Sequence, residues 1–177
     1  IADTEFKFYM SAKGTFYVDW GDGTVDTIVR NDTDETLYNH TYLTAGVKTI
    51  RFGGLATGYS TQEHASAIRF GNYVADATTP TLILAIDGSI GQIFPTLGVA
   101  ASQQPCFNLI FARTMITSIP ENLFSGVVGN ATSMFQSAFN RCSNLVSIPE
   151  NLFKNITGAA EDMFRYTFIY CSSLRSI

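Results

Sequence analysis

The sequence predicts an α+β protein in which a small antiparallel β-sandwich is followed by a solenoid of about 29-residue repeats. Three observations support this prediction. Apolar and polar residues alternate in short runs near the N-terminus, a seven-residue phrase recurs further on, and no Pro/Ser-rich linker separates the two parts. We therefore expect one rigid body, with residues 1–56 forming the sandwich and residues 57–177 forming the repeat array.

The alternating runs predict the strands of the sandwich. Phe and Met alternate with polar neighbours over residues 6–10, and Phe, Val and Trp do so over residues 16–20. Asp22-Gly23 follows the second run, which predicts a hairpin turn. VKTIRF, residues 47–52, predicts a further strand. Because so small a sandwich buries little surface alone, we expect bridging strands at residues 67–70 and 81–86.

The repeated phrase is SIPENLF, which runs from Ser118 to Phe124 and recurs unchanged from Ser147 to Phe153, 29 positions later. Units of this kind stack on one another and place like residues in ladders. PENLF suits a helical turn with proline at its first position, and residues 159–168 suit a second helical segment. The side chains that we expect in the ladders are Phe124, Phe153, Phe135, Phe164, Phe139, Phe168, Cys142, Cys171, Leu145, Leu174, Ile119, Ile148 and Ile177.

The ends of the array differ from its middle. A degenerate copy begins at Ser89-Ile90, and we expect residues 57–88 to form a degenerate N-terminal capping repeat. We expect the array to be cut in mid-repeat at Ile177, where PENLF would follow. We expect the chain to be a monomer in dilute solution.

These repeats resemble the BspA-type leucine-rich repeats of bacterial surface proteins. The resemblance rests on MFQSAFNRCSNLVSIPENLF and MFRYTFIYCSSLRSI and covers about residues 89–177. It implies a secreted or surface-anchored protein that serves adhesion, with no catalytic residue to transfer. Arg113 departs from the pattern, because Cys142 and Cys171 stand 29 and 58 positions later.

The N-terminal part resembles a PKD-type β-sandwich domain. FYVDWGDGTV, YNHTY and VKTIRF carry this resemblance, which covers about 50 residues. It implies an extracellular spacer or interaction module in which His40 packs near Trp20. The residues of the implied structural motif are Trp20, Asp22, Gly23, His40 and Tyr42.

The composition argues against several classes of protein. Net charge is −4 and the basic residues are scattered, which argues against nucleic-acid binding. No apolar run reaches the roughly 18 to 20 residues of a membrane span. The three cysteines form no CxxC pair and the two histidines lie far apart, which argues against zinc. Motifs of hydrolases, nucleotide-binding proteins and metalloproteases are missing. We expect no enzyme, catalytic residue or cofactor.

Two local features have alternative interpretations. Asp19, Asp22 and Asp26 could bind Ca²⁺ through carboxylate oxygens, but their spacing does not fit an EF-hand, and turn chemistry explains Asp22. We predict a structural turn and no metal site. Cys142 and Cys171 stand at equivalent repeat positions and are predicted to be buried small side chains rather than a disulfide.

The favoured function is a non-enzymatic binding module, extracellular or on the bacterial cell surface, that adheres to a host protein or glycan through the repeat face. The alternatives are a carbohydrate-binding accessory module of a polysaccharide-degrading protein, with Tyr9, Tyr17 and Tyr38 as sugar platforms, or a passive spacer. The candidate interaction surface consists of variable residues between the ladders: Gln136, Arg141, Lys154, Arg165 and Arg175.

Overall fold

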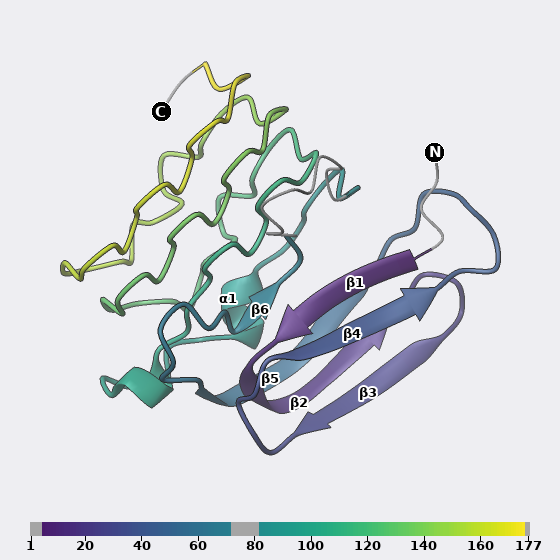
Figure 1. The fold of residues 1–177 in the computed structure, drawn as a ribbon, viewed down its shortest axis with the longest axis horizontal. Helices are drawn as coiled ribbons and strands as arrows, with labels where there is room; N and C mark the ends of the chain where they lie inside the picture. The colour runs from purple at the N-terminus through teal and green to yellow at the C-terminus, as the bar shows by residue number, and fades with distance from the viewer. Residues whose placement is uncertain (1–4, 72–81, 176–177) are drawn as a thin grey trace.

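The computed structural model describes residues 5–71 and 82–175 and contains two small antiparallel sheets (Figure 1). One sheet has the order β4-β1-β6, and its strands are β1 (Glu5–Met10), β4 (Thr36–Thr41) and β6 (Ile68–Arg69). The other has the order β3-β2-β5, and its strands are β2 (Ala12–Asp19), β3 (Val25–Arg30) and β5 (Arg51–Tyr59). The sheets face each other as a sandwich around one aromatic core.

Alternation along the strands produces this core. In β2 every second residue is buried, as expected for a strand with one face against the other sheet. Phe8 is fully buried and its ring contacts those of Trp20, Tyr38 and Phe52. The predicted hairpin is confirmed, because β2 and β3 pair in antiparallel register around the Asp22-Gly23 turn.

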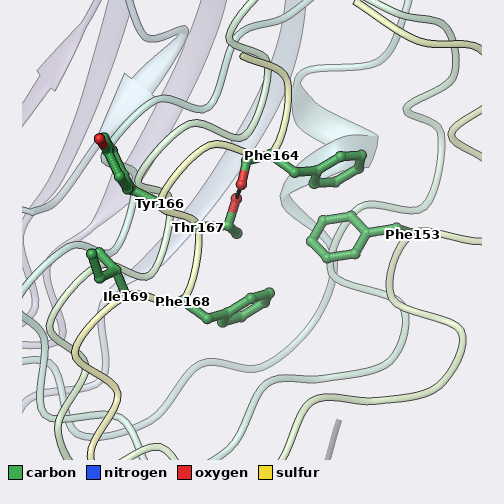
Figure 2. Close-up of a pocket in the computed structure, with 6 residues that line it drawn as sticks. All are labelled: Phe153, Phe164, Tyr166, Thr167, Phe168 and Ile169. Carbon is green, nitrogen blue, oxygen red and sulfur yellow. Dashed lines mark hydrogen bonds between the residues drawn. The ribbon is translucent and has the colours of Figure 1, made fainter.

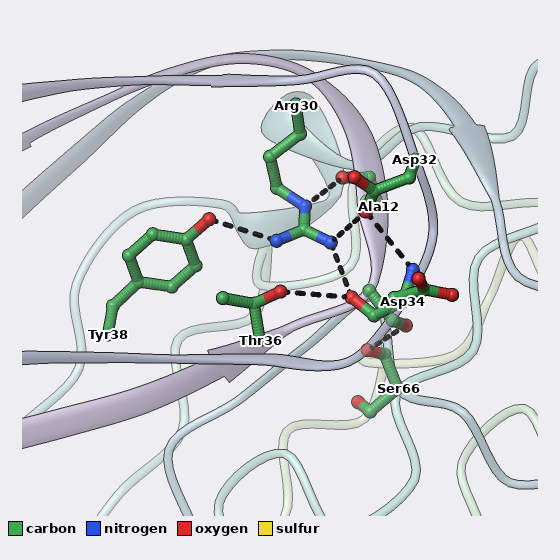
Figure 3. Close-up of polar contacts among 8 residues, drawn as sticks. Ala12, Arg30, Asp32, Asp34, Thr36, Tyr38 and Ser66 are labelled. Atoms are coloured by element: carbon green, nitrogen blue, oxygen red, sulfur yellow. Dashed lines mark hydrogen bonds and ion pairs between the residues drawn. The ribbon is translucent and has the colours of Figure 1, made fainter.

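The buried cation of Arg30 joins the two sheets, because it bonds to β2 and to β4. Arg30, on β3, donates from Nε to the Ala12 carbonyl at 3.0 Å and from Nη1 to the Tyr38 hydroxyl at 2.9 Å (Figure 3). Its Nη2 donates to the Asp32 carboxylate and to the Asp34 carbonyl. A charge can be buried when its donors are satisfied in this way. The bonds to Asp32 and Asp34 also hold the loop between β3 and β4 against Arg30.

The bridging strands are confirmed only in part. β6 covers two of the residues expected at 67–70 and pairs with β1. Residue 81 lies outside the described residues, and residues 82–86 form no strand. The boundary expected after residue 56 falls within β5.

The predicted α+β class is wrong. The described residues contain one four-residue α-helix, α1 (Ile90–Ile93), and one three-residue 3₁₀ turn (Ala101–Gln103), so nearly all regular structure is β. A leucine-rich-repeat solenoid of strand and helix units is not found in the described part. Both predicted helical segments are runs of turns, because the N–H groups of PENLF residues bond three residues back and left-handed residues interrupt 159–168.

The repeated segments form three irregular coils, which lie side by side in Figure 1 (teal to yellow). We name them coil 1 (residues 105–114), coil 2 (132–142) and coil 3 (161–171). Alternate N–H groups bond within a coil, as from Ile110 to the Phe107 carbonyl at 3.2 Å. The others reach the next coil, as from Phe107 to the Met134 carbonyl at 2.6 Å. Positive φ angles recur every fourth residue, at Leu109 and Arg113, Ser133, Ser137 and Arg141, and Asp162, Tyr166 and Tyr170.

Like aromatic rings stack between coils 2 and 3. Phe135 and Phe164 have centroids 5.4 Å apart, and Phe139 and Phe168 lie 5.3 Å apart. Phe124 also stacks on Phe153, at 5.7 Å between centroids. Of the other residues expected in the ladders, four are buried and two are partly buried: Cys142, Cys171, Leu145 and Ile119, and Leu174 and Ile148. Ile177 lies outside the described residues.

Coil 1 extends both rows of rings, but its phenylalanines are 28 residues before those of coil 2 and not the 29 of the sequence repeat. Phe107 stacks under Phe135 at 5.9 Å, and Phe111 stacks under Phe139 at 5.8 Å, each 28 rather than 29 positions earlier. Thr114, not Arg113, therefore lies beneath Cys142, and the Thr114 Oγ1–Cys142 Sγ distance is 3.3 Å.

The sandwich covers the first coil. Ala67 donates its N–H to the Cys106 carbonyl at 2.7 Å, and Phe70 donates to the Ile110 carbonyl at 2.8 Å. Phe16 of β2 stacks on Phe94 at 5.3 Å, so the two parts share one apolar core. Within residues 5–71 and 82–175, no helix has the length and hydropathy that a membrane crossing requires.

Candidate interaction surface

The structural motif of the sandwich forms a compact cluster around Trp20. The His40 ring stacks on the Trp20 indole with centroids 4.6 Å apart and planes 9° apart. His40 Nε2 lies 2.7 Å from Asp22 Oδ2, and the Tyr42 hydroxyl donates to the Trp20 carbonyl at 2.9 Å. Gly23 completes the turn with a positive φ. The cluster holds β4 against the hairpin turn, so its role is structural.

The electrostatics of this turn agree with that task. The Asp22 carboxylate accepts a hydrogen bond from the Thr24 hydroxyl and another from the His40 ring. These bonds, the first more than the second, hold the pKa of Asp22 well below its ordinary value. Asp22 therefore stays ionised as an anchor for the turn, rather than as a proton donor.

The neighbouring carboxylates are also used locally. Asp19 Oδ1 accepts the Gly21 N–H at 2.9 Å, and Asp26 Oδ2 accepts the Trp20 indole N–H at 2.9 Å. Across the described part of the chain, no three His, Cys, Asp or Glu side chains gather as a metal ion would require. The Ca²⁺ alternative thus finds no ligand cluster there.

The three tyrosines considered as sugar platforms do not form one platform. Tyr9 lies on β1 under the Arg69 guanidinium, 3.9 Å from the ring centroid. Tyr38 stacks against Phe8 in the core. Only Tyr17, on the other sheet, is broadly exposed.

A different set of side chains projects from the last two coils. The Arg141 guanidinium lies 4.4 Å from the Tyr170 ring centroid, and the Arg165 guanidinium lies 4.8 Å from the Tyr166 ring centroid. Tyr166 is 49% exposed and Tyr170 is 61% exposed. We call Arg141, Arg165, Tyr166 and Tyr170 the Arg/Tyr surface.

The four-residue rhythm of coil 3 places these residues outward. Phe164 and Phe168 turn toward Phe153, whereas Tyr166 and Ile169 lie on the opposite side of the backbone (Figure 2). Left-handed residues recur every four positions, and in coil 3 the buried Met163, Thr167 and Cys171 alternate with the exposed Arg165, Tyr166 and Tyr170. The outward pairs in coil 3 are therefore 165–166 and 169–170.

Arg165 is held in place by its neighbours. Its Nη2 donates to the Tyr166 hydroxyl at 3.2 Å, and its Nη1 lies 2.9 Å from Asp162 Oδ2. The Tyr166 hydroxyl and, after it, the Asp162 carboxylate raise the pKa of Arg165 above its already high ordinary value. Arg165 is therefore a permanent cation whose orientation is fixed by its own neighbours.

The five residues of the predicted interaction surface do not form one patch. Arg141 and Arg165 lie beside exposed tyrosines, and Gln136 is half-buried on coil 2. Lys154 lines a separate groove of about 480 Å³ between the two PENLF segments. Arg175 is exposed, and its N–H bonds to the Val146 carbonyl.

Sequence reasoning missed the two tyrosines of the surface. A signal was available, because Tyr166 and Tyr170 replace Ser137 and Arg141 of the preceding repeat, 29 positions earlier. A polar position that becomes aromatic in the next unit is a departure that stacking does not require. Exposed tyrosine beside arginine is instead typical of binding surfaces.

Comparisons with protein-family models, with curated proteins and with solved structures gave no significant match. The resemblances to BspA-type repeats and to a PKD-type domain are therefore supported by their motifs alone.

Proposed function

We propose that the chain is a non-enzymatic binding module that holds an extracellular protein or glycan on the Arg/Tyr surface, in secreted form or at a bacterial cell surface. The observation that carries this proposal is the presence of two exposed Arg–Tyr pairs, one between coils 2 and 3 and one within coil 3. Tyrosine and arginine are the side chains that most often dominate the energy of binding interfaces, with tryptophan.

Preorganisation supports this use of the surface. A tyrosine offers a large contact area while only two side-chain torsions have to be ordered. Arg165 is already fixed by Asp162 and Tyr166, and Arg141 rests on Tyr170, so little additional entropy is lost when a partner binds.

The charge of the surface indicates the chemistry of the partner. Two guanidinium groups offer forked donors that match carboxylate or sulfate oxygens, and Asp162 offsets only one of them. An acidic patch on a protein, or an acidic glycan, therefore fits better than a neutral sugar polymer.

The test is binding of the purified chain to a panel of immobilised matrix proteins, mucins and polysaccharides. A Tyr166→Ala/Tyr170→Ala variant should bind its ligand at least about tenfold more weakly, because each truncation removes an anchor. Tyr17→Ala is the matched control, since Tyr17 is also 49% exposed but lies on the sandwich.

Each outcome separates the candidate functions. Unchanged binding by the double variant would refute the Arg/Tyr surface. Loss of polysaccharide binding in Tyr17→Ala alone would favour a carbohydrate-binding sandwich. A panel without any ligand would favour a spacer.

A further inference from the structure

We propose that the groove between the two PENLF segments is a second binding site, and that its ligand is an uncharged saccharide. One wall of the groove comes from residues 121–127 and the other from residues 151–156, and its volume is about 480 Å³. Cavities of this size are typical of small-molecule sites. None of the four residues of the Arg/Tyr surface lines the groove, so the two sites are separate.

The groove is open because a proline interrupts the bonding between neighbouring segments. One repeat earlier, the Gly91 N–H donates to the Leu123 carbonyl at 3.1 Å and ties residues 89–96 to the first wall. Pro120 stands 29 positions after Gly91 and has no N–H to donate. The Leu152 carbonyl, the counterpart of that of Leu123, accepts no hydrogen bond in the described part of the chain. The gap between the walls is therefore a property of these two segments, and it offers a backbone acceptor.

The walls of the groove are held in place without a ligand. Behind the first wall, the Ser89 hydroxyl lies 3.1 Å from the Leu123 carbonyl oxygen and 3.2 Å from that of Ser125. Between the walls, Asn151 Nδ2 donates to Glu121 Oε1 at 2.6 Å. A site that is ordered in this way loses little entropy when it binds.

The remaining polar side chains of the groove are available to a ligand. In residues 5–71 and 82–175, the Asn122 and Asn155 amides and the Lys154 ammonium find no hydrogen-bond or ion-pair partner. Each amide can donate and accept, the ammonium donates, and the Leu152 carbonyl accepts. A hydroxyl group also donates and accepts, so neighbouring hydroxyls on a sugar ring match this mixed set.

The floor and the charge of the groove indicate the class of saccharide. Val127 and Leu152 are buried and line the groove, so they offer apolar surface to the C–H groups of a sugar ring. Glu121 and Lys154 are the charged residues that line it, and their charges have opposite sign. An uncharged saccharide therefore fits better than an acidic glycan. An apolar peptide side chain fits less well, because it would leave the amides unpaired.

The first test uses the wild-type chain and a panel of neutral oligosaccharides of glucose, mannose, galactose and xylose. Backbone amide shifts are followed by NMR at ligand concentrations up to about 10 mM, which detects millimolar dissociation constants. At least one of these saccharides should shift the amides of residues 121–127 and 151–156 and leave those of β2 in place. Oligogalacturonate, an acidic counterpart, should bind the groove at least several-fold more weakly.

Two variants locate the site independently. Asn122→Ala and Asn155→Ala each remove an amide without a protein partner, so the fold should be kept. Each should weaken binding of the neutral saccharide at least about fivefold, because a hydrogen bond to the ligand is lost. Asn31→Ala is the matched control, since Asn31 is an exposed asparagine between β3 and β4. The Tyr166→Ala/Tyr170→Ala variant should bind the neutral saccharide as the wild type does, which distinguishes this site from the Arg/Tyr surface.

Four results would overturn the proposal. They are a panel in which no neutral saccharide shifts the amides of the groove, shifts confined to other parts of the chain, tighter binding of oligogalacturonate to the groove, and wild-type affinity in both asparagine variants. The first three results need no variant, so a folding defect could not obscure them.

Discussion

The sandwich and the coils satisfy their backbones in different ways. In the sandwich, β2 pairs along its length with β3 on one side and β5 on the other, and the aromatic rings meet at varied angles around Trp20. In the coils, only every second N–H is bonded locally, and the rest depend on the next coil. The Phe135–Phe164 and Phe139–Phe168 pairs are nearly parallel, at 12° and 2°, because neighbouring units repeat by translation.

This difference determines how stability is distributed. The sandwich closes on itself, whereas a coil is stable only if a neighbour supplies the other half of its bonds and covers its rings. Coil 2 has neighbours on both sides and coil 3 has one in the described structure. Equivalent residues in the two coils should therefore contribute unequally to the free energy of unfolding.

The largest expected effect tests this inequality directly. Phe135→Ala should lower the free energy of unfolding by about 3–5 kcal/mol, because the ring is fully buried among Phe107, Phe124, Phe153 and Phe164. Phe164→Ala should cost only about 1 kcal/mol, because part of its ring already contacts water. Urea unfolding followed by circular dichroism measures both. Equal costs would contradict the stacking order described above.

The next effect concerns the close approach of β2 and β5 in the sandwich. Gly54 has φ +109°, and a Cβ there would overlap the Thr15 carbonyl oxygen and lie 2.6 Å from the Phe16 Cα. Gly54→Ala should cost more than about 2 kcal/mol, because the backbone itself would have to move. Gly53→Ala is the control, with open space around the added methyl group, and should change stability by less than about 1 kcal/mol. Thermal unfolding compares the pair.

A smaller effect distinguishes the regions by pH. Folding lowers the pKa of Asp22, so its contribution to stability is complete above the ordinary value of 3.8 and is lost as pH falls toward the lower folded-state value. Asp22→Asn should reduce the melting temperature at pH 7 and weaken its further decline between about pH 5 and pH 2. Glu150→Gln, at an exposed carboxylate in the repeats, is the control. Parallel acid profiles for wild type and Asp22→Asn would contradict the anchoring role.

The smallest expected effect is on the alkylation rate of the three cysteines, which all lie in the coils and become reactive when a coil opens. Burial raises the pKa of Cys106 and of Cys171 to about 11 and also raises the pKa of Cys142. All three are free, and we expect little alkylation by iodoacetamide at pH 8 in the folded state, because the thiolate is the reactive form. Mass spectrometry should show faster labelling in Phe135→Ala. Rapid labelling of the wild type would contradict the burial.

Some of this architecture could be predicted from local chemistry. Asp22-Gly23 predicts the hairpin, because aspartate and glycine are strongly favoured in tight turns. The repeated phrase indicated that like side chains recur at fixed intervals, and the rings of Phe135 and Phe164 do stack. Both features depend on residues close in sequence or on simple repetition.

The candidate site was less accessible to sequence reasoning. The sequence marks Arg141 and Arg165 as variable positions, but it does not show that Arg141 rests on Tyr170 and Arg165 on Tyr166. Variability also predicts Lys154 as part of the same surface, whereas the structure places it in another groove. Whether two outward side chains meet depends on the four-residue rhythm of the coil, and a helical interpretation of residues 159–168 groups residues onto different faces.

By itself the sequence determined the hairpin around Asp22, the alternating strands, and which apolar residues of the repeats recur together. The tertiary structure alone decided that the repeats are coils and not helices, and that coil 1 stacks on coil 2 with an offset of 28 residues. The physical reason is the choice of hydrogen-bond partner. An N–H group of a repeat can bond within its own coil or to a neighbouring coil, and which bond it makes depends on whether that neighbour is in place. The positive φ at Ser137 and Tyr166 follows from this hydrogen-bond pattern and not from the residue type.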